Sequence, residues 1–69
     1  MLNIENVRKK ENITLVDMGD LIEKNYRTVR EKIDNDSFTT SEAFLIYNAF
    51  FKARGYDFAY LFSKTLEQS

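Results

Sequence analysis

Residues 14–36, TLVDMGDLIEKNYRTVREKIDND, have the pattern of two short helices joined by a tight turn. The earlier of these two helices is predicted over about residues 15–23. Its apolar stripe, at i, i+3 and i+4 spacing, consists of Met18, Leu21 and Ile22. Gly19 lies in the same helix and leaves room for a crossing helix to approach closely. This half of the segment is therefore expected to pack against the rest of the molecule.

The later of these two helices, about residues 26–33, is strongly basic. The charged residues between positions 24 and 33 are Lys24, Arg27, Arg30 and Lys32, against Glu31 alone. Val29 and Ile33 are its only candidates for burial, so most of this helix is predicted to lie outside the core. The sign of the charge reverses directly afterwards, at Asp34 and Asp36.

Capping signals divide the chain into five predicted helices, over about residues 4–11, 15–23, 26–33, 40–53 and 58–65. In two places a threonine stands three residues before an acid, which predicts a capping box: Thr14 with Asp17, and Thr39 with Glu42. Single side-chain caps are predicted at Asn3 or its neighbour, at Asn25 and at Asp57. Asn12 and Gly55 are predicted to end the first and fourth helices.

The composition favours one small all-α domain spanning residues 1–69. The chain has 43% apolar residues, no proline and two glycines, which suits helices better than hairpins. It has no cysteine and no histidine, so disulfides, thiolate chemistry and the commonest metal ligand are excluded. No apolar run is long enough to span a bilayer, and the first ten residues lack the apolar block of a signal peptide. We expect a cytoplasmic protein without cofactor or metal, and not an enzyme.

The net charge argues against a dedicated nucleic-acid binder. Ten basic residues stand against eleven acidic ones, a formal charge of −1, whereas such binders usually carry a basic surplus. A local basic strip on an acidic background can still steer a helix into a groove. Since it makes few phosphate contacts, binding would be modest and sensitive to salt.

Six phenylalanines and four tyrosines are first of all expected to fill the core of a small domain that has no tryptophan. Phe50, Phe58 and Phe62 are predicted to be buried. The fourth helix is apolar on too many sides to bury all of them, so Phe44 and Phe51 are predicted to form a dimer or partner interface. A symmetric homodimer through this surface is therefore expected.

Four stretches carry a resemblance to a known family. In chain order they are NIENVRKKENIT, VDMGDLIEKNYRTVREKI, FTTSEAFLIY and YDFAYLF. Together they resemble the λ-repressor-like helix-turn-helix family, especially short regulators of Gram-positive phages and prophages. In that family a small residue lies within the second helix, here Gly19, and an apolar residue anchors the third, here Val29. The resemblance implies a compact five-helix DNA-binding domain with its helix-turn-helix unit at about residues 15–33.

The resemblance also implies a site and a function. The third helix would enter the major groove of operator DNA as the recognition helix of a small transcriptional regulator. The residues expected to face the groove are Asn25, Tyr26, Arg27, Arg30 and Glu31. Lys24 and Lys32 would contact phosphates, which position a protein on DNA rather than specify a sequence. The alternative for all of these residues is a solvated, charged helix face.

Three departures from the family pattern leave a second function open. Leu15 occupies the corner where relatives often have a phosphate-binding Gln. Glu23 replaces the usual Gly of the turn, and Asp34 and Asp36 replace an Asn-Gly-Lys-like loop beside the DNA backbone. A carboxylate close to a phosphate repels it by about 1 kcal/mol or more. The chain is therefore also a candidate antirepressor, whose helix-turn-helix surface binds a cognate repressor protein instead of DNA.

Overall fold

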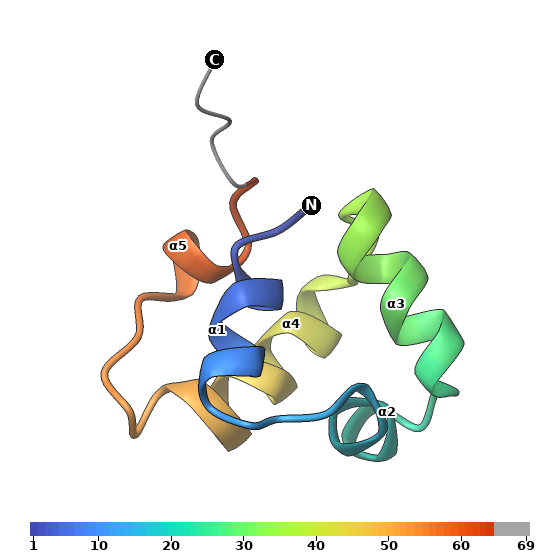
Figure 1. The fold of residues 1–69 in the computed structure, drawn as a ribbon, viewed down its shortest axis with the longest axis horizontal. Helices are drawn as coiled ribbons and strands as arrows, with labels where there is room; N and C mark the ends of the chain where they lie inside the picture. The colour runs from blue at the N-terminus through green and yellow to red at the C-terminus, as the bar shows by residue number, and fades with distance from the viewer. Residues whose placement is uncertain (65–69) are drawn as a thin grey trace.

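Helices make up most of the described part of the chain, residues 1–64 of a computed structural model (Figure 1). In chain order they are α1 (Ile4–Lys10), α2 (Leu15–Ile22), α3 (Tyr26–Asn35), α4 (Thr40–Ile46), the π-helical turn η1 (Tyr47–Phe51) and α5 (Phe58–Leu61). Within these residues the one strand-like pairing is an isolated antiparallel bridge between Leu2 and Lys64. The all-α fold class is confirmed. The fifth helix, predicted to reach Thr65, ends at Leu61, and Thr65 lies outside the described residues.

The core is apolar and draws on every helix. Its buried side chains are Leu2, Ile4, Val7, Ile13, Met18, Ile22, Val29, Ile33, Ala43, Ile46, Phe51 and Leu61. In the view of Figure 1, α4 lies between α1 and α3, with α2 below; α2 contacts both α3 and α4, and α5 contacts α1. The helices therefore surround a single cluster of side chains, and α3 lies at the edge of the molecule.

The turn between α2 and α3 forms without the usual glycine at its centre. α2 begins at the predicted capping box, in which Thr14 Oγ1 accepts the Asp17 amide at 3.0 Å and the Asp17 carboxylate accepts the Thr14 amide at 3.1 Å. It ends at Glu23, whose φ of 59° is in the left-handed region. The Lys24 amide then donates to the Gly19 carbonyl at 2.9 Å, which closes the turn.

α3 contacts the core through a narrow apolar stripe, the seat of this helix, which consists of Val29 and Ile33. Asn25 caps its N-terminus as predicted, because the Asn25 side chain accepts the Arg27 amide at 2.8 Å. Val29 and Ile33 are the only buried residues of the helix, and both are fully buried. The sparse seat predicted from the sequence is therefore confirmed, and the other faces of α3 are available for polar contacts.

The fourth helix differs from its prediction after Ile46. One α-helix was expected to continue to about residue 53, whereas the α-helix ends at Ile46 and a π-helical turn follows, Tyr47–Phe51. In an α-helix two residues five apart point about 140° away from each other. The wider π turn, with its i to i+5 hydrogen bonds, reduces this difference. Ile46 and Phe51 can therefore both reach the core, where both are fully buried.

The ends of the described chain are joined by polar contacts. Asn3 was predicted to cap α1, but it makes no side-chain cap. Its Nδ2 donates to the Tyr60 carbonyl of α5 at 2.8 Å, and its amide donates to the Ser63 carbonyl at 2.9 Å. Asp57 caps α5 as predicted, by accepting the Tyr60 amide. Asn3 therefore ties the start of α1 to the segment around α5.

The capping box of α4 gives a direct test of the capping argument. Thr39 Oγ1 accepts the Glu42 amide at 3.1 Å, and the Glu42 carboxylate accepts the Thr39 amide at 3.0 Å. We expect Thr39→Ala to lower the free energy of unfolding by about 1 kcal/mol, the usual cost of removing such a cap. Urea denaturation followed by circular dichroism measures this. Thr40→Ala, at the exposed first position of the helix, is the matched control, and an equal loss in both variants would contradict the prediction.

Candidate nucleic-acid interface

Five of the seven residues that the sequence analysis assigned to DNA are exposed, and four of these five lie in the turn before α3 and in its first turn. Lys24, Asn25, Tyr26 and Arg27 are all exposed. The guanidinium carbon of Arg27 lies 5.8 Å from the centre of the Tyr26 ring, and Arg27 Nε donates to the Tyr26 hydroxyl at 3.4 Å. A cation held near an aromatic ring is attracted by it even at an exposed site. Tyr26 and Arg27 therefore form one contact surface at the start of the helix.

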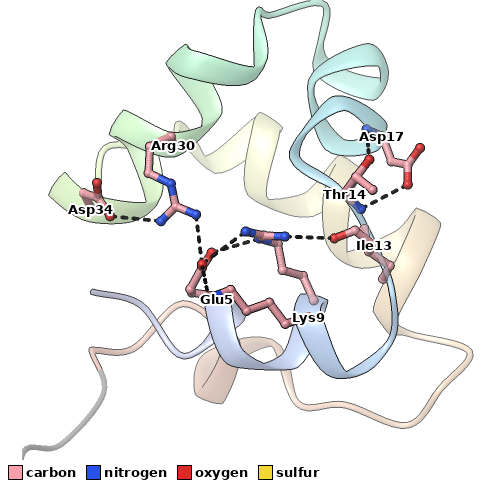
Figure 2. Close-up of polar contacts among 8 residues, drawn as sticks. Glu5, Lys9, Ile13, Thr14, Asp17, Arg30 and Asp34 are labelled. Atoms are coloured by element: carbon pink, nitrogen blue, oxygen red, sulfur yellow. Dashed lines mark hydrogen bonds and ion pairs between the residues drawn. The ribbon is translucent and has the colours of Figure 1, made fainter.

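Arg30, predicted to read a base, forms two ion pairs within the protein. Its Nη2 donates to Glu5 Oε2 of α1 at 2.8 Å, and its Nη1 donates to Asp34 Oδ1 at 3.3 Å. Figure 2 shows the Arg30 side chain directed from α3 toward Glu5. The side chain of Arg30 is 33% exposed and that of Glu5 only 2%. A guanidinium shared by two carboxylates has fewer donors free for a guanine than an unpaired one.

Lys32, predicted to contact a phosphate, forms an ion pair with a residue of α4. Its Nζ lies 3.0 Å from Glu42 Oε1, and both side chains are mostly buried. Burial tends to raise the pKa of Glu42, but hydrogen bonding to Thr39 and the contact with Lys32 outweigh it and lower that pKa. The carboxylate stays ionised near neutral pH and holds the ammonium group. Lys32 therefore joins α3 to α4.

Glu5, a buried carboxylate that the sequence analysis did not single out, accepts hydrogen bonds from two helices. Arg8 donates to it through Nε at 2.8 Å and through Nη2 at 3.1 Å, and Lys9 Nζ lies 3.3 Å away. Burial raises the pKa of Glu5, but the hydrogen bonds from Arg30, Arg8 and Lys9 and the charge of Arg8 outweigh this and lower it to about 2. In the sequence, the local indication of these contacts was the pair of basic residues Arg8 and Lys9, three and four positions after Glu5. The contact from Arg30, 25 residues away, has no local signal.

The remaining outer surface of α3 and its flanking turns is acidic. Four exposed carboxylates lie there, on Glu23, Glu31, Asp34 and Asp36. Among the described residues, Lys24 and Arg27 form no ion pair, so they are the two cations of this surface that remain open to a ligand. The basic strip predicted along the whole helix is thus reduced to its first turn.

The corner at the start of α2 lacks a phosphate-binding group, as the sequence indicated. Leu15 is partly buried and packs against the core, and the next residue, Val16, is 53% exposed. Neither side chain can donate a hydrogen bond to a phosphate. At Leu15 and Val16 themselves, a polar contact can come only from the backbone.

The predicted aromatic interface is half wrong. Phe51 is fully buried because η1 directs it into the core, so it cannot contact a second molecule. Phe44 is 50% exposed and stacks on Phe58 with ring centroids 4.9 Å apart. Phe50, Phe58 and Phe62, predicted to be buried, are partly buried. A dimer through Phe44 stays a prediction.

Neither family models, curated proteins nor solved structures give a match to this chain. The λ-repressor-like likeness therefore rests on the residues quoted above. Between residues 1 and 64 there is no pocket and no group of three or more acidic, histidine or cysteine side chains placed to hold a metal ion. In that same part of the chain, no helix has the length and apolar character needed to cross a bilayer.

Proposed function

We propose that this protein is a small helix-turn-helix regulator that binds double-stranded DNA through the first turn of α3. The observation that supports this most strongly is the exposed group of Tyr26 and Arg27 at the start of a helix that follows a tight turn. Recognition helices of helix-turn-helix proteins contact base edges mainly through their N-terminal residues. A λ-repressor-like regulator of phage or prophage type, acting in the cytoplasm, fits this arrangement.

Each exposed residue has a role in this proposal. The guanidinium group of Arg27 can donate two parallel hydrogen bonds to N7 and O6 of a guanine. Tyr26 can contact a thymine methyl group or donate from its hydroxyl to a phosphate. Lys24, in the turn before the helix, suits a phosphate contact. Arg30 and Lys32 are left out of the DNA contact, because their charges are already paired with Glu5 and Glu42.

The proposal predicts a large effect of Arg27. The DNA probe for this experiment is obtained by selection. A library of duplexes with a randomised central segment is incubated with the protein, and the bound duplexes are recovered over several rounds. On that probe, Arg27→Ala should weaken binding by about 10- to 100-fold, the loss of one bidentate base contact. It should leave the slope of log affinity against log salt concentration nearly unchanged, because that slope counts phosphate contacts and Arg27 is assigned to a base. Fluorescence anisotropy titrations measure both quantities.

Lys52→Ala is the matched control for this experiment. It removes one exposed positive charge that lies just after η1, outside the α2–α3 unit. Its affinity should stay within about twofold of the parent protein, because a distant exposed charge is screened by salt. Equal losses in Arg27→Ala and Lys52→Ala would indicate general electrostatic attraction and would contradict base reading by α3.

The acidic surface supports a second candidate function, capture of a cognate repressor. Glu31, Asp34 and Asp36 repel phosphates, but they would attract the basic DNA-binding face of a repressor. Here the protein alone would retain no duplex and would release a repressor from its operator. A gel shift with the neighbouring intergenic DNA, with and without that repressor, separates the two functions. Specific retardation by this protein alone would eliminate a pure antirepressor.

A further inference from the structure

α3 has little apolar contact to fix its rotation about its own axis. Its seat consists of Val29 and Ile33, which lie four residues apart on one side of the helix. With so narrow a stripe, few apolar contacts on the flanks of the helix oppose a roll. A roll of about 20°, at the radius of about 6 Å where side chains end, moves a side-chain tip by about 2 Å. That movement is large compared with the tolerance of a hydrogen bond.

Two ion pairs lie on opposite flanks of this seat. At 100° per residue, Arg30 lies about 100° to one side of Val29, and Lys32 lies about 60° to the other side. Arg30 contacts Glu5 of α1 at 2.8 Å, and Lys32 contacts Glu42 of α4 at 3.0 Å. The two pairs therefore connect α3 to two different helices. Each pair opposes a roll of α3 in one direction, and the two directions are opposite.

Both acceptor carboxylates are themselves held in place. Glu5 is fixed by two hydrogen bonds from Arg8, whose Nη1 also donates to the Ile13 carbonyl at 3.2 Å. Glu42 is fixed by the Thr39 amide of its capping box at 3.0 Å. Ion pairs at an exposed surface contribute little, but these four side chains range from 2% to 33% exposed. Carboxylates that are fixed in place and shielded from water can therefore hold α3 in one orientation.

We propose that Glu5 and Glu42 are positioning residues that together set the roll of α3, and so decide where Tyr26 and Arg27 meet a ligand. The consequence for DNA rests on the proposed function, whereas the mechanical part does not. Loss of the α1 pair leaves α3 held from the α4 side alone, and loss of the α4 pair does the reverse. The two losses should turn the helix in opposite senses.

The chain has no cysteine, so two introduced cysteines take spin labels without side reactions. Labels at Lys10→Cys on α1 and Glu31→Cys on α3, both exposed positions, report the distance across this side of the molecule. Pulsed electron resonance should show the mean distance moving in opposite directions in Glu5→Gln and Glu42→Gln. Gln keeps the ability to accept the Thr39 amide, so Glu42→Gln preserves the cap of α4 while it removes the charge. It serves as the second variant if Glu5→Gln folds poorly.

Glu11→Gln is the matched control. Glu11 is paired with Arg54 and accepts from the Tyr56 hydroxyl, away from α3, so its loss should leave the distance unchanged. Unchanged distances in both Glu5→Gln and Glu42→Gln, or equal changes in Glu11→Gln, would overturn the inference whether or not DNA binds.

The DNA readout separates positioning from stability. On the selected duplex, Glu5→Gln and Glu42→Gln should lose about tenfold in affinity, since Arg27 no longer meets its base. On a scrambled duplex their affinity should match that of Glu11→Gln, which has the same net charge. Equal losses on both duplexes would show a merely structural role and would overturn the inference. If no duplex is retained by the parent protein, the proposed function fails, and the label distances still decide whether the roll is set.

Discussion

Gly19→Ala should lower the free energy of unfolding by about 2–3 kcal/mol. A Cβ at this position would overlap the Lys24 carbonyl oxygen and would lie 3.5 Å from Val29 Cγ2. The atom in the way belongs to the backbone of the turn, so the turn itself has to shift. That shift strains the hydrogen bond from the Lys24 amide to the Gly19 carbonyl. Overpacking of this kind costs about 1–3 kcal/mol, and loss of a backbone hydrogen bond adds about 1, against a gain of up to about 1 in helix propensity.

Such a loss is large for a chain of this size. A domain of 69 residues has a total stability of roughly 3–10 kcal/mol. The melting temperature should therefore fall by about 10–20 °C, which thermal denaturation followed by circular dichroism would show. Gly55→Ala is the control: its φ of 83° strains any side chain, but nothing lies within 4 Å of the added methyl group. It should cost only about 1–2 kcal/mol, and a larger loss there than at Gly19 would refute the steric argument.

The elements of the fold could be predicted where their causes are local. The capping boxes of Thr14 and Thr39 and the cap of Asn25 depend on residues within a few positions, and all three formed as expected. The narrow seat of α3 followed from the absence of other apolar residues in that helix. By contrast, the burial of Phe51 depends on a π turn. No local pattern in the sequence predicts that turn, because the turn is stabilised by the contact of Phe51 with core residues that are distant in the sequence.

The candidate site was harder to predict for the same reason. Charge counting along α3 treated Arg30 and Lys32 as free cations, since their partners lie on other helices. Sequence periodicity places both residues on the flanks of the helix, but it does not show that carboxylates face them. Tyr26 and Arg27 were predicted to be exposed and are, because the first turn of a helix at the edge of a bundle has few neighbours.

Glu5→Gln should cost about 3 kcal/mol at pH 7 and progressively less in acid. The pKa of Glu5 is lowered in the folded protein, from 4.5 to about 2. A carboxylate with a lowered pKa stabilises the folded state above its unfolded pKa, and this contribution is lost as the pH falls through the folded value. A difference of about 2.5 pKa units corresponds to roughly 3 kcal/mol. The stabilisation should therefore be complete above about pH 5 and should fade between pH 4.5 and pH 2.

The measurement is a series of urea denaturations of the parent protein and of Glu5→Gln at each pH. The two stability curves should be separated by about 3 kcal/mol at pH 7 and should converge as the pH approaches 2. Asp34→Asn is the matched control, because it removes the other carboxylate that contacts Arg30. Asp34 is 44% exposed, so its loss should cost less than about 1 kcal/mol. Parallel curves for Glu5→Gln and the parent protein down to pH 2 would mean that the buried carboxylate contributes no pH-dependent stability. The ion pair between α1 and α3 would then be a consequence of their packing and not one of its causes.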